Sequence, residues 1–312
     1  MLGVCRLSLA VARLDALRAA GKRGLADVLG RIESRPDDPD VQALLDEAWA
    51  RQDGLAIGFT GPPGVGKSTL IGVLSACFRR AGRSVAVLAV DPSSRLSGGA
   101  LLGDRVRISA DGSDAGLYIR SLAARDRLGG LTELATPFTV LFRSLFDFVL
   151  IETVGVGQSE TDVADLADLV VLCAQPGSGD SVQFMKAGVA EIPDLAVVCK
   201  SDLGAPAQKL ASDLRGALSL AMRTGQSLEV LMVSQQDDAS VQVLADRLLS
   251  WPGAAASRRE IQAGVWLRSV ITAEYGRQGW RSLSDQQTHI GASPFATART
   301  CAAFLGDKLK GV

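Results

Sequence analysis

Residues 58–70 read GFTGPPGVGKSTL, and this stretch decides the kind of fold that the chain forms. Within it, Gly61 to Ser68 follow the pattern Gly-x-x-x-x-Gly-Lys-Ser, between an apolar run at 55–60 and an amphipathic run at 67–81. Glycines at this spacing let successive backbone N–H groups turn toward phosphate oxygens, and the helix that follows directs its positive end at the same anion. A loop of this pattern between a strand and a helix predicts a nucleoside triphosphate site.

Two side chains of this loop have separate roles in the predicted site. Lys67 is expected to neutralise the β- and γ-phosphate oxygens and so to act in catalysis, while the Ser68 hydroxyl is expected to ligate Mg²⁺. The residues expected to line the phosphates are Gly61, Pro62, Pro63, Gly64, Val65, Gly66, Lys67, Ser68 and Thr69. The loop alone does not distinguish ATP from GTP, or a kinase from a hydrolase.

Short β-branched runs alternate with longer amphipathic stretches in the middle of the chain. The expected strands are 55–60, 84–90, 146–153, 168–174, 195–200 and 228–234. The expected helices lie near 67–81, 131–144, 161–167, 180–190, 205–224 and 237–250. Nearly continuous apolar strands that are spaced by helices indicate a mostly parallel sheet covered on both faces. The expected fold class is therefore α/β, a P-loop NTPase sheet flanked by helices.

The composition changes on either side of this sheet region. Residues 1–50 are rich in Ala and Leu with helical periodicity, and a polar, proline-containing break at 34–40 separates two helices. Residues 251–312 begin with a Pro-Gly break and continue as a helix near 258–275, a loop and a final helix. We therefore expect a helical N-terminal extension at 1–50, a P-loop domain at 51–250, and a helical C-terminal extension at 251–312.

Charge and hydropathy narrow the classes of partner. The 312 residues carry 33 basic and 34 acidic side chains, a net charge of −1, which gives no electrostatic reason to bind nucleic acid or an anionic membrane. No apolar run is long enough to span a bilayer. Charges interrupt residues 1–20, so an amphipathic helix is favoured over a signal peptide, with a mitochondrial transit peptide as a less favoured alternative. The expected location is the cytoplasm.

The cysteines and the single histidine give no sign of a metal centre. The five cysteines are scattered without a Cys-x-x-Cys pair, and they are Cys5, Cys77, Cys173, Cys199 and Cys301. This usage fits a reducing compartment in which cysteines act as small core residues. His289 lacks the partners that a metal site needs, so it is expected to be a polar residue of a C-terminal loop.

Acidic residues follow two of the expected strands. Asp91 directly follows the run at 84–90, and Glu152 ends the run at 146–152, so both belong at the carboxyl edge of the sheet, where ligands bind in open α/β folds. A carboxylate there can hold Mg²⁺ through water, and Gly155 can offer its N–H to a γ-phosphate. Asp104, in a glycine-rich segment, is a third candidate ligand of the metal.

Eight short segments occur in a fixed order along the chain: GPPGVGKSTL, VDPSS, SGGALLGDR, YIRSL, LGG, IETVGVGQSE, PGSGD and KSD. In this order they resemble the MeaB/ArgK-type GTPases, the chaperones of adenosylcobalamin-dependent methylmalonyl-CoA mutase and related acyl-CoA mutases. The resemblance covers about residues 50–250, and GASPFATA near the C-terminus resembles the closing segment of the family. It implies a SIMIBI-class G domain whose helical extensions support a homodimer.

The resemblance also implies site residues. It places Ser68, Asp91, Asp104 and Glu152 around Mg²⁺, with some of these contacts made through water, and it makes Glu152 a catalytic residue. It implies switch segments at 97–108, 152–160 and 175–188. Within the third, Lys186 corresponds to a lysine that assists hydrolysis when the partner is bound. Gln158 is a weaker candidate for orienting water, because the family completes its switch with the partner.

The function implied by the resemblance is that of a mutase chaperone. The chain would bind and hydrolyse GTP with Mg²⁺, slowly alone and faster with its partner, an adenosylcobalamin-dependent acyl-CoA mutase. It would gate cofactor loading and protect or reactivate the mutase, without binding cobalamin itself. An adenosyltransferase is a second candidate partner. Which acyl-CoA mutase is the partner stays open.

The stretch VVCKSD, residues 197–202, stands where many GTPases carry the guanine-reading pattern Asn-Lys-x-Asp. Asp202 can accept from both N–H donors of the guanine edge, whereas adenine presents a lone pair there, so GTP preference is expected. Lys200 can lie along the base. Cys199 replaces the asparagine that usually contacts the base and ties it to the phosphate loop, so weaker binding with retained preference is expected. Ser234 and the backbone of Gln235 are expected near guanine O6, although the family more often has Ser-Ala there.

Two other functions stay open at this stage. One is a nucleotide-dependent maturation factor for another metalloenzyme, which clusters of His and Cys ligands would favour. The other is a nucleotide-binding scaffold with little hydrolysis, against which the complete set of Lys67, Ser68 and Glu152 argues. A protein kinase function has no supporting motif.

Overall fold

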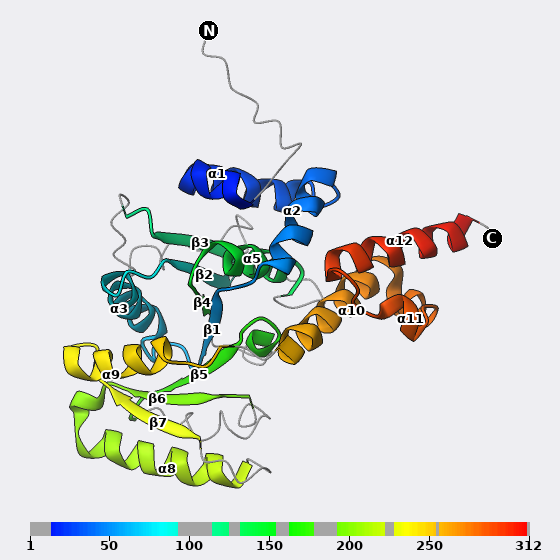
Figure 1. The fold of residues 1–312 in the computed structure, drawn as a ribbon. Coiled ribbons are helices and arrows are strands. Elements are labelled where there is room, and N and C mark those ends of the chain that lie inside the picture. Colours follow the sequence, from blue (N-terminus) through cyan, green and yellow to red (C-terminus); the bar gives the residue numbers. More distant parts are fainter. Residues whose placement is uncertain are drawn as a thin grey trace.

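The core of the protein is a seven-stranded sheet of order β3-β2-β4-β1-β5-β6-β7. The structure is a computed structural model that describes residues 14–92, 114–124, 132–153, 162–177, 192–221, 228–253 and 256–310. The strands are β1 (Leu55–Thr60), β2 (Val85–Pro92), β3 (Leu117–Ala124), β4 (Phe148–Glu152), β5 (Leu169–Ala174), β6 (Leu195–Cys199) and β7 (Glu229–Val233). Each pairs with its neighbours in parallel. The predicted α/β sheet is confirmed (Figure 1).

One strand was absent from the sequence prediction. β3 forms the edge of the sheet and pairs with β2 along its whole length, from Leu117 opposite Val85 to Ala124 opposite Pro92. Arg120 interrupts its apolar pattern, and in the structure this side chain donates to Glu33 at 2.6 Å. An edge strand that places a charge against a covering helix lacks the continuous apolar run of a central strand, which explains why periodicity alone did not reveal it.

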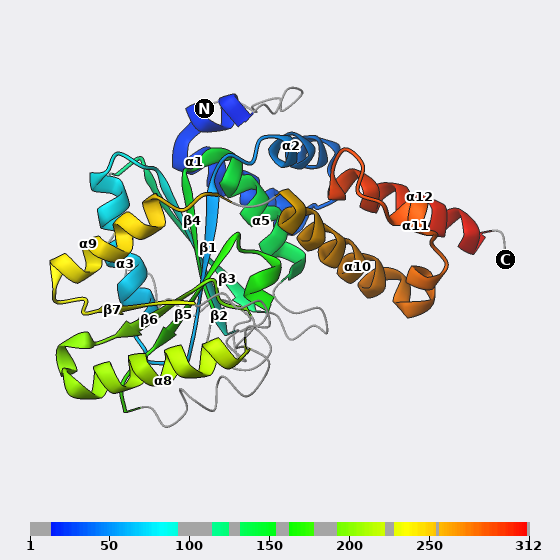
Figure 2. The ribbon, with the colours of Figure 1, turned by 60° about the horizontal axis from the view of Figure 1, so that its bottom comes forward.

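Helices cover both faces of the sheet, as the apolar strands require. On one face lie α3 (Lys67–Arg80) and α9 (Asp238–Leu249), which share an apolar cluster with β1, β5 and β6. On the other face lie α5 (Thr132–Leu145) and α8 (Ala205–Ala221). Figure 2 shows α3 and α9 on the side of the strands opposite to α5. The helix expected at 161–167 is instead the short 3₁₀ helix η1 (Val163–Asp165), and the helix expected at 180–190 lies outside the described residues.

The N-terminal segment packs over α5. α1 (Leu14–Ser34) and α2 (Pro39–Ala50) are separated by the predicted polar break, at which Asp38 caps α2 by accepting from Asp40 N at 3.0 Å. Leu29 and Leu44, on these two helices, are fully buried in the same apolar cluster as Phe138 of α5. The expected helix pair is therefore present from Leu14 onward, and residues 1–13 lie outside the description.

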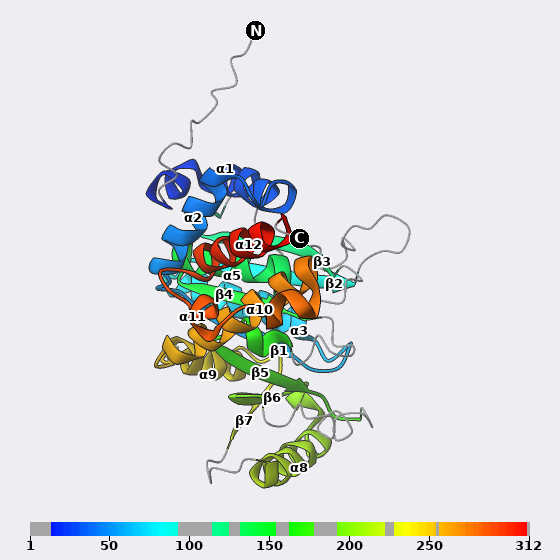
Figure 3. The same ribbon diagram turned by 90° about the vertical axis from the view of Figure 1, so that its right-hand side faces the viewer.

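The C-terminal helices form an arm beside the sheet. α10 (Ala256–Arg281), kinked at Gly276, is followed by α11 (Asp285–Thr288) and α12 (Pro294–Lys310). Figure 1 shows the three helices projecting from one side of the sheet, and Figure 3 shows α12 in front of α5. No helix in the described part of the chain is both long and apolar enough to cross a bilayer. Exposed His289 ends α11, in the polar connection that the sequence predicted.

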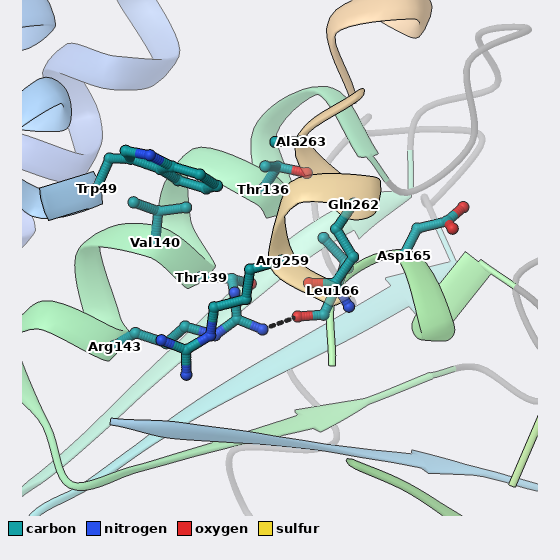
Figure 4. Close-up of a pocket in the computed structure, with 10 residues that line it drawn as sticks. All are labelled: Trp49, Thr136, Thr139, Val140, Arg143, Asp165, Leu166, Arg259, Gln262 and Ala263. Carbon is teal, nitrogen blue, oxygen red and sulfur yellow. Dashed lines mark hydrogen bonds between the residues drawn. The ribbon is translucent and has the colours of Figure 1, made fainter. Parts of the chain in front are cut away.

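A buried carboxylate fastens this arm to the sheet. Asp168, directly before β5, accepts from Ala56 N at 2.8 Å, from Arg143 of α5 at 2.9 Å and from Arg259 of α10 at 3.0 Å. Gln262 of α10 donates to the carbonyls of Ala164 and Ala167 at 2.8 and 2.7 Å. Figure 4 shows Arg143, Arg259 and Gln262 facing one small pocket between α5 and α10.

Candidate nucleotide-binding site

The phosphate loop connects the end of β1 to the first turn of α3. Gly61, Gly64 and Gly66 have φ angles of 138°, 75° and 101°, a region that glycine enters without steric cost. A Cβ on Gly61 would lie 2.1 Å from the carbonyl oxygen of Cys173 on β5, so no side chain fits there. The glycines of the sequence pattern are thus required by the backbone and by the neighbouring strand.

The other loop residues divide between core and solvent. Val65 is fully buried and belongs to the apolar cluster beneath α3, and Pro62, three residues earlier, is also buried. Pro63, Gly64 and Thr69 are exposed. The loop is therefore attached to the core through Val65 and open to solvent on its outer side.

Lys67 folds back over the loop that precedes it. Its ammonium donates to the carbonyl oxygens of Gly61 at 2.7 Å and Pro62 at 3.1 Å, and the residue is only 6% exposed. A buried cation needs such partners. The positive charge predicted to act on a phosphate is thus held by the phosphate loop itself.

Ser68 and Glu152 meet at the carboxyl edge of the sheet. Ser68 is the second residue of α3, Glu152 ends β4, and the serine hydroxyl donates to Glu152 Oε1 at 2.5 Å. Both residues are buried. Mg²⁺ in nucleotide sites is held by one or two protein oxygen ligands together with phosphates and waters. This pair of oxygen ligands next to the phosphate loop fits that requirement.

Of the remaining predicted metal and switch residues, the structure describes only the backbone of Asp91. Asp91 is the second-last residue of β2, two residues beyond Ala89, which pairs with Glu152, so its backbone lies at the same edge of the sheet. Its side chain is not described. Asp104, Gly155, Gln158 and Lys186 lie outside the described residues, and their roles stay predictions.

The predicted base-reading residues gather at the ends of β6 and β7. Asp202, in the 3₁₀ helix η4 (Ser201–Leu203), is exposed, and its Oδ1 accepts from the Ser234 hydroxyl at 2.7 Å. Ser234 directly follows β7 and is 3% exposed. The structure thus shows Ser234 orienting the carboxylate that the sequence predicts to read the base.

Lys200 has an unusual backbone and a defined partner. Its φ of 56° makes it the single residue other than glycine with positive φ in the described ranges. Its ammonium donates to Gln175 Oε1 at 2.6 Å, at the start of the segment expected to form the third switch. The base-reading motif is therefore linked by a side chain to the beginning of that segment.

Cys199 faces the core. It is 1% exposed and lies in the apolar cluster that also contains Val65 and Cys173. Cys77, Cys173, Cys199 and Cys301 are all buried free thiols, in agreement with their predicted role as small core residues.

Gln235 makes a contact that the sequence did not reveal. The side-chain Nε2 donates to the carbonyl oxygen of Gly66 at 2.9 Å, 169 residues away along the chain. The sequence predicted a role for the Gln235 backbone near the base, and the structure adds a side-chain contact with the phosphate loop. A hydrogen bond between residues so far apart leaves no periodic signal in the sequence.

Comparisons with known proteins identify the family of the chain. The family model described as "Methylmalonyl Co-A mutase-associated GTPase MeaB" matches residues 25–277. A putative GTPase of Pyrococcus horikoshii is 42% identical over 192 residues, which are 61% of this chain and 60% of that protein. The mitochondrial methylmalonic aciduria type A homolog of Mus musculus is 37% identical over 246 residues, 74% of this chain and 59% of that protein.

One solved structure is similar in fold to nearly the whole chain. The crystal structure of an LAO/AO transport system kinase has a TM-score of 0.60 and 25% identity, covering 98% of this chain and 99% of the other. The chain spans only about three fifths of the length of the Pyrococcus and mouse relatives, with 60% and 59% covered. The family model spans most of this chain, including the phosphate loop, Glu152 and the residues predicted to read the base. The chain belongs to the MeaB family, the methylmalonyl Co-A mutase-associated GTPases.

Proposed function

We propose that this chain binds GTP with Mg²⁺ and hydrolyses it to GDP and phosphate, as a chaperone of an adenosylcobalamin-dependent acyl-CoA mutase. One observation carries the proposal. Lys67 and the Ser68–Glu152 pair lie at the phosphate loop, and the Asp202–Ser234 pair lies at the ends of neighbouring strands at the same edge of the sheet. Each group is already oriented by a hydrogen bond, which supports the proposal that they form the two ends of one nucleotide site.

In the proposed reaction, water attacks the γ-phosphorus, the bond to the oxygen bridging to the β-phosphate breaks, and GDP leaves. Lys67 would stabilise the negative charge on the phosphate oxygens. Ser68 and Glu152, with Asp91 and Asp104, would hold Mg²⁺ directly or through water. When bound, the metal neutralises charge on the β- and γ-phosphates. Lys186 would assist once the partner is bound, and hydrolysis by the chain alone is therefore expected to be slow.

Lys67→Ala is expected to weaken GTP binding about 10²-fold, because charge-assisted hydrogen bonds contribute about 1.5–3 kcal/mol each. Isothermal titration with GTP would measure this, with circular dichroism to check the fold, since Lys67 is buried. Lys209→Ala, which removes an exposed lysine of α8, is the matched control and should leave affinity unchanged. Equal affinity of the Lys67 variant and the control would contradict the assignment of Lys67 to the phosphates.

The proposed partner is an acyl-CoA mutase that uses adenosylcobalamin, with an adenosyltransferase as a second candidate. The proposal is supported by the family description, which names a methylmalonyl Co-A mutase-associated GTPase. Binding of cobalamin is assigned to the mutase and not to this chain. The function therefore predicts that one specific mutase binds the chain and accelerates its GTP hydrolysis.

The test is a pull-down combined with a phosphate-release assay, with methylmalonyl-, ethylmalonyl-, isobutyryl- and hydroxyisobutyryl-CoA mutases added one at a time. We expect one of them to be retained and to raise the rate of hydrolysis well above that of the chain alone. An unrelated CoA-dependent enzyme without cobalamin serves as control. Fast turnover without a partner, or no stimulation by any mutase, would contradict the chaperone function and leave a generic G protein.

We further propose that residues 251–312 serve as the dimerisation arm of a P-loop domain at 51–250, with residues 1–50 as the N-terminal extension. Ile261 and Val265, one turn apart on α10, are 68% and 38% exposed, an apolar surface that a second copy could cover. Light scattering of the purified chain tests this proposal. A monomer at all concentrations, with and without GTP, would rule out the arm as a dimer contact.

A further inference from the structure

Gln235 joins the two ends of the proposed nucleotide site. Its Nε2 donates to the carbonyl oxygen of Gly66 at 2.9 Å, while the residue before it, Ser234, donates to the carboxylate of Asp202 at 2.7 Å. Gly66 is the residue of the phosphate loop directly before α3, and Asp202 is the expected base reader. One dipeptide after β7 therefore contacts both the loop assigned to the phosphates and the carboxylate assigned to the base.

The contact with Gly66 is made at the point where the loop backbone turns through a left-handed conformation into α3. Gly66 has a φ of 101° and caps α3. Its carbonyl oxygen also accepts from Leu70 N at 2.9 Å, the first hydrogen bond of the helix. A Cβ on Gly66 would lie 2.7 Å from Gln235 Nε2, so the amide packs directly against the loop backbone. The Gln235 side chain thus helps to hold the loop in its left-handed turn at the start of α3.

The dipeptide is itself fixed by the following turn. Ser234 N donates to the Ser240 hydroxyl at 3.1 Å, and Asp237 N donates to the Ser234 carbonyl at 3.0 Å. Asp237 then caps α9 by accepting from Ala239 N and Ser240 N. α9 packs beside α3 on the same face of the sheet. Gln235 therefore reaches the phosphate loop from a rigid position.

Cys199 is not placed to make this contact. It is 1% exposed in the apolar cluster that holds Val65 of the phosphate loop. Its thiol is hydrogen-bonded with that of Cys173, which, together with burial, raises the pKa of Cys173 well above its usual value. The position that carries asparagine in many GTPases is here occupied by a cysteine of the apolar cluster that also contains Val65 of the loop.

We infer that Gln235 is a positioning residue, which makes the tie between the base-reading end and the phosphate loop that asparagine makes in GTPases with the Asn-Lys-x-Asp pattern. The inference rests on the proposed nucleotide-binding function. A loop that is held in its binding conformation before the ligand arrives loses less freedom on binding. The tie should therefore raise affinity for any nucleotide, whereas Asp202 selects the base.

The first measurement compares Gln235→Ala with Gln236→Ala, a matched control at the exposed neighbouring residue. Dissociation constants for GTP, GDP and ATP are determined by titration calorimetry on the full chain. Gln235→Ala should weaken all three by a common factor of roughly two to ten, the effect of one lost hydrogen bond. The ratio of GTP to ATP affinity should stay unchanged, and Gln236→Ala should behave as the parent protein.

Two further variants distinguish the hydrogen bond from Gln235 to Gly66 from the packing of the Gln235 side chain against the loop. Gln235→Glu keeps the size of the side chain but sets a carboxylate against the Gly66 carbonyl, so it should weaken binding at least as much as alanine. Cys199→Asn should tighten binding, and more strongly in the Gln235→Ala background, because asparagine can restore the missing tie. Such non-additivity is what a double-mutant cycle measures.

A third measurement, made without nucleotide, tests whether Gln235 holds the phosphate loop in the free protein. Hydrogen exchange of the amides of residues 66–70 should be faster in Gln235→Ala than in Gln236→Ala. Equal exchange and equal affinities in these two variants would overturn the inference, whether or not Cys199→Asn folds. Tighter binding of ATP than of GTP by the parent protein would instead contradict the proposed function, and the exchange comparison would still decide the role of Gln235.

Discussion

Replacement of Asp202 by alanine is expected to remove the preference for GTP over ATP. An ionised carboxylate accepts two hydrogen bonds from the guanine edge, and each charge-assisted bond contributes about 1.5–3 kcal/mol, so GTP affinity should fall by roughly 10²- to 10⁴-fold. ATP makes neither bond, and its affinity should change little. The Ser234 hydroxyl, 2.7 Å from Asp202 Oδ1, holds the carboxylate in place for this role.

The measurement is a pair of dissociation constants, for GTP and for ATP, determined on the same preparation. Asp213→Ala removes an exposed carboxylate of α8 and is the matched control, which should leave both constants unchanged. Because Asp202 is exposed, its loss should not affect folding. A GTP to ATP ratio that survives in Asp202→Ala would mean that the base is read elsewhere in the chain.

Asp168→Asn should destabilise the whole protein by about 3–5 kcal/mol, the cost of leaving a buried charge without its partner. Asp168 is fully buried and is the shared partner of Arg143 and Arg259. Burial lowers the pKa of Arg143 to about 10 even beside this carboxylate, so Arg143 stays charged at pH 7. Asparagine keeps the shape of the side chain but removes the negative charge on which both arginines depend.

Urea unfolding would measure this loss as a change in the free energy of unfolding. Glu229→Gln is the matched control, because it breaks an ion pair with Arg247 in which both side chains are more than a third exposed. Exposed pairs contribute about 0–1 kcal/mol, so the control should be close to the parent protein. A similar small effect for Asp168→Asn would show that the buried cluster does not stabilise the attachment of α10.

The fold could be predicted from the sequence because its signals are local. The glycine and lysine pattern of 61–68 specifies a turn between a strand and a helix, and continuous apolar runs specify buried parallel strands. β3 was missed because an edge strand carrying Arg120 does not show that pattern. The expected helix at 161–167 became the short η1, because residues of this segment are held by contacts with α10 through Gln262.

Within the candidate site, the identity of the groups could be predicted from the sequence. Lys67, Ser68, Glu152 and Asp202 were named from motif and strand order, since a phosphate loop and the carboxyl edge of a parallel sheet restrict where such residues lie. Their orientation was not determined in this way. The pairing of Ser68 with Glu152 and of Asp202 with Ser234 joins residues that are 84 and 32 positions apart.

How the chain accommodates cysteine in place of asparagine becomes visible in the packing of the folded chain. The sequence marked Cys199 as a weakened element, and the structure shows a thiol in an apolar cluster and a Gln235 amide on the loop above it. Motifs and periodicity record the short-range requirements of turns, helices and strands. A side-chain contact across 169 residues depends on how β7, α9 and the phosphate loop pack together, and that packing is set by the whole core.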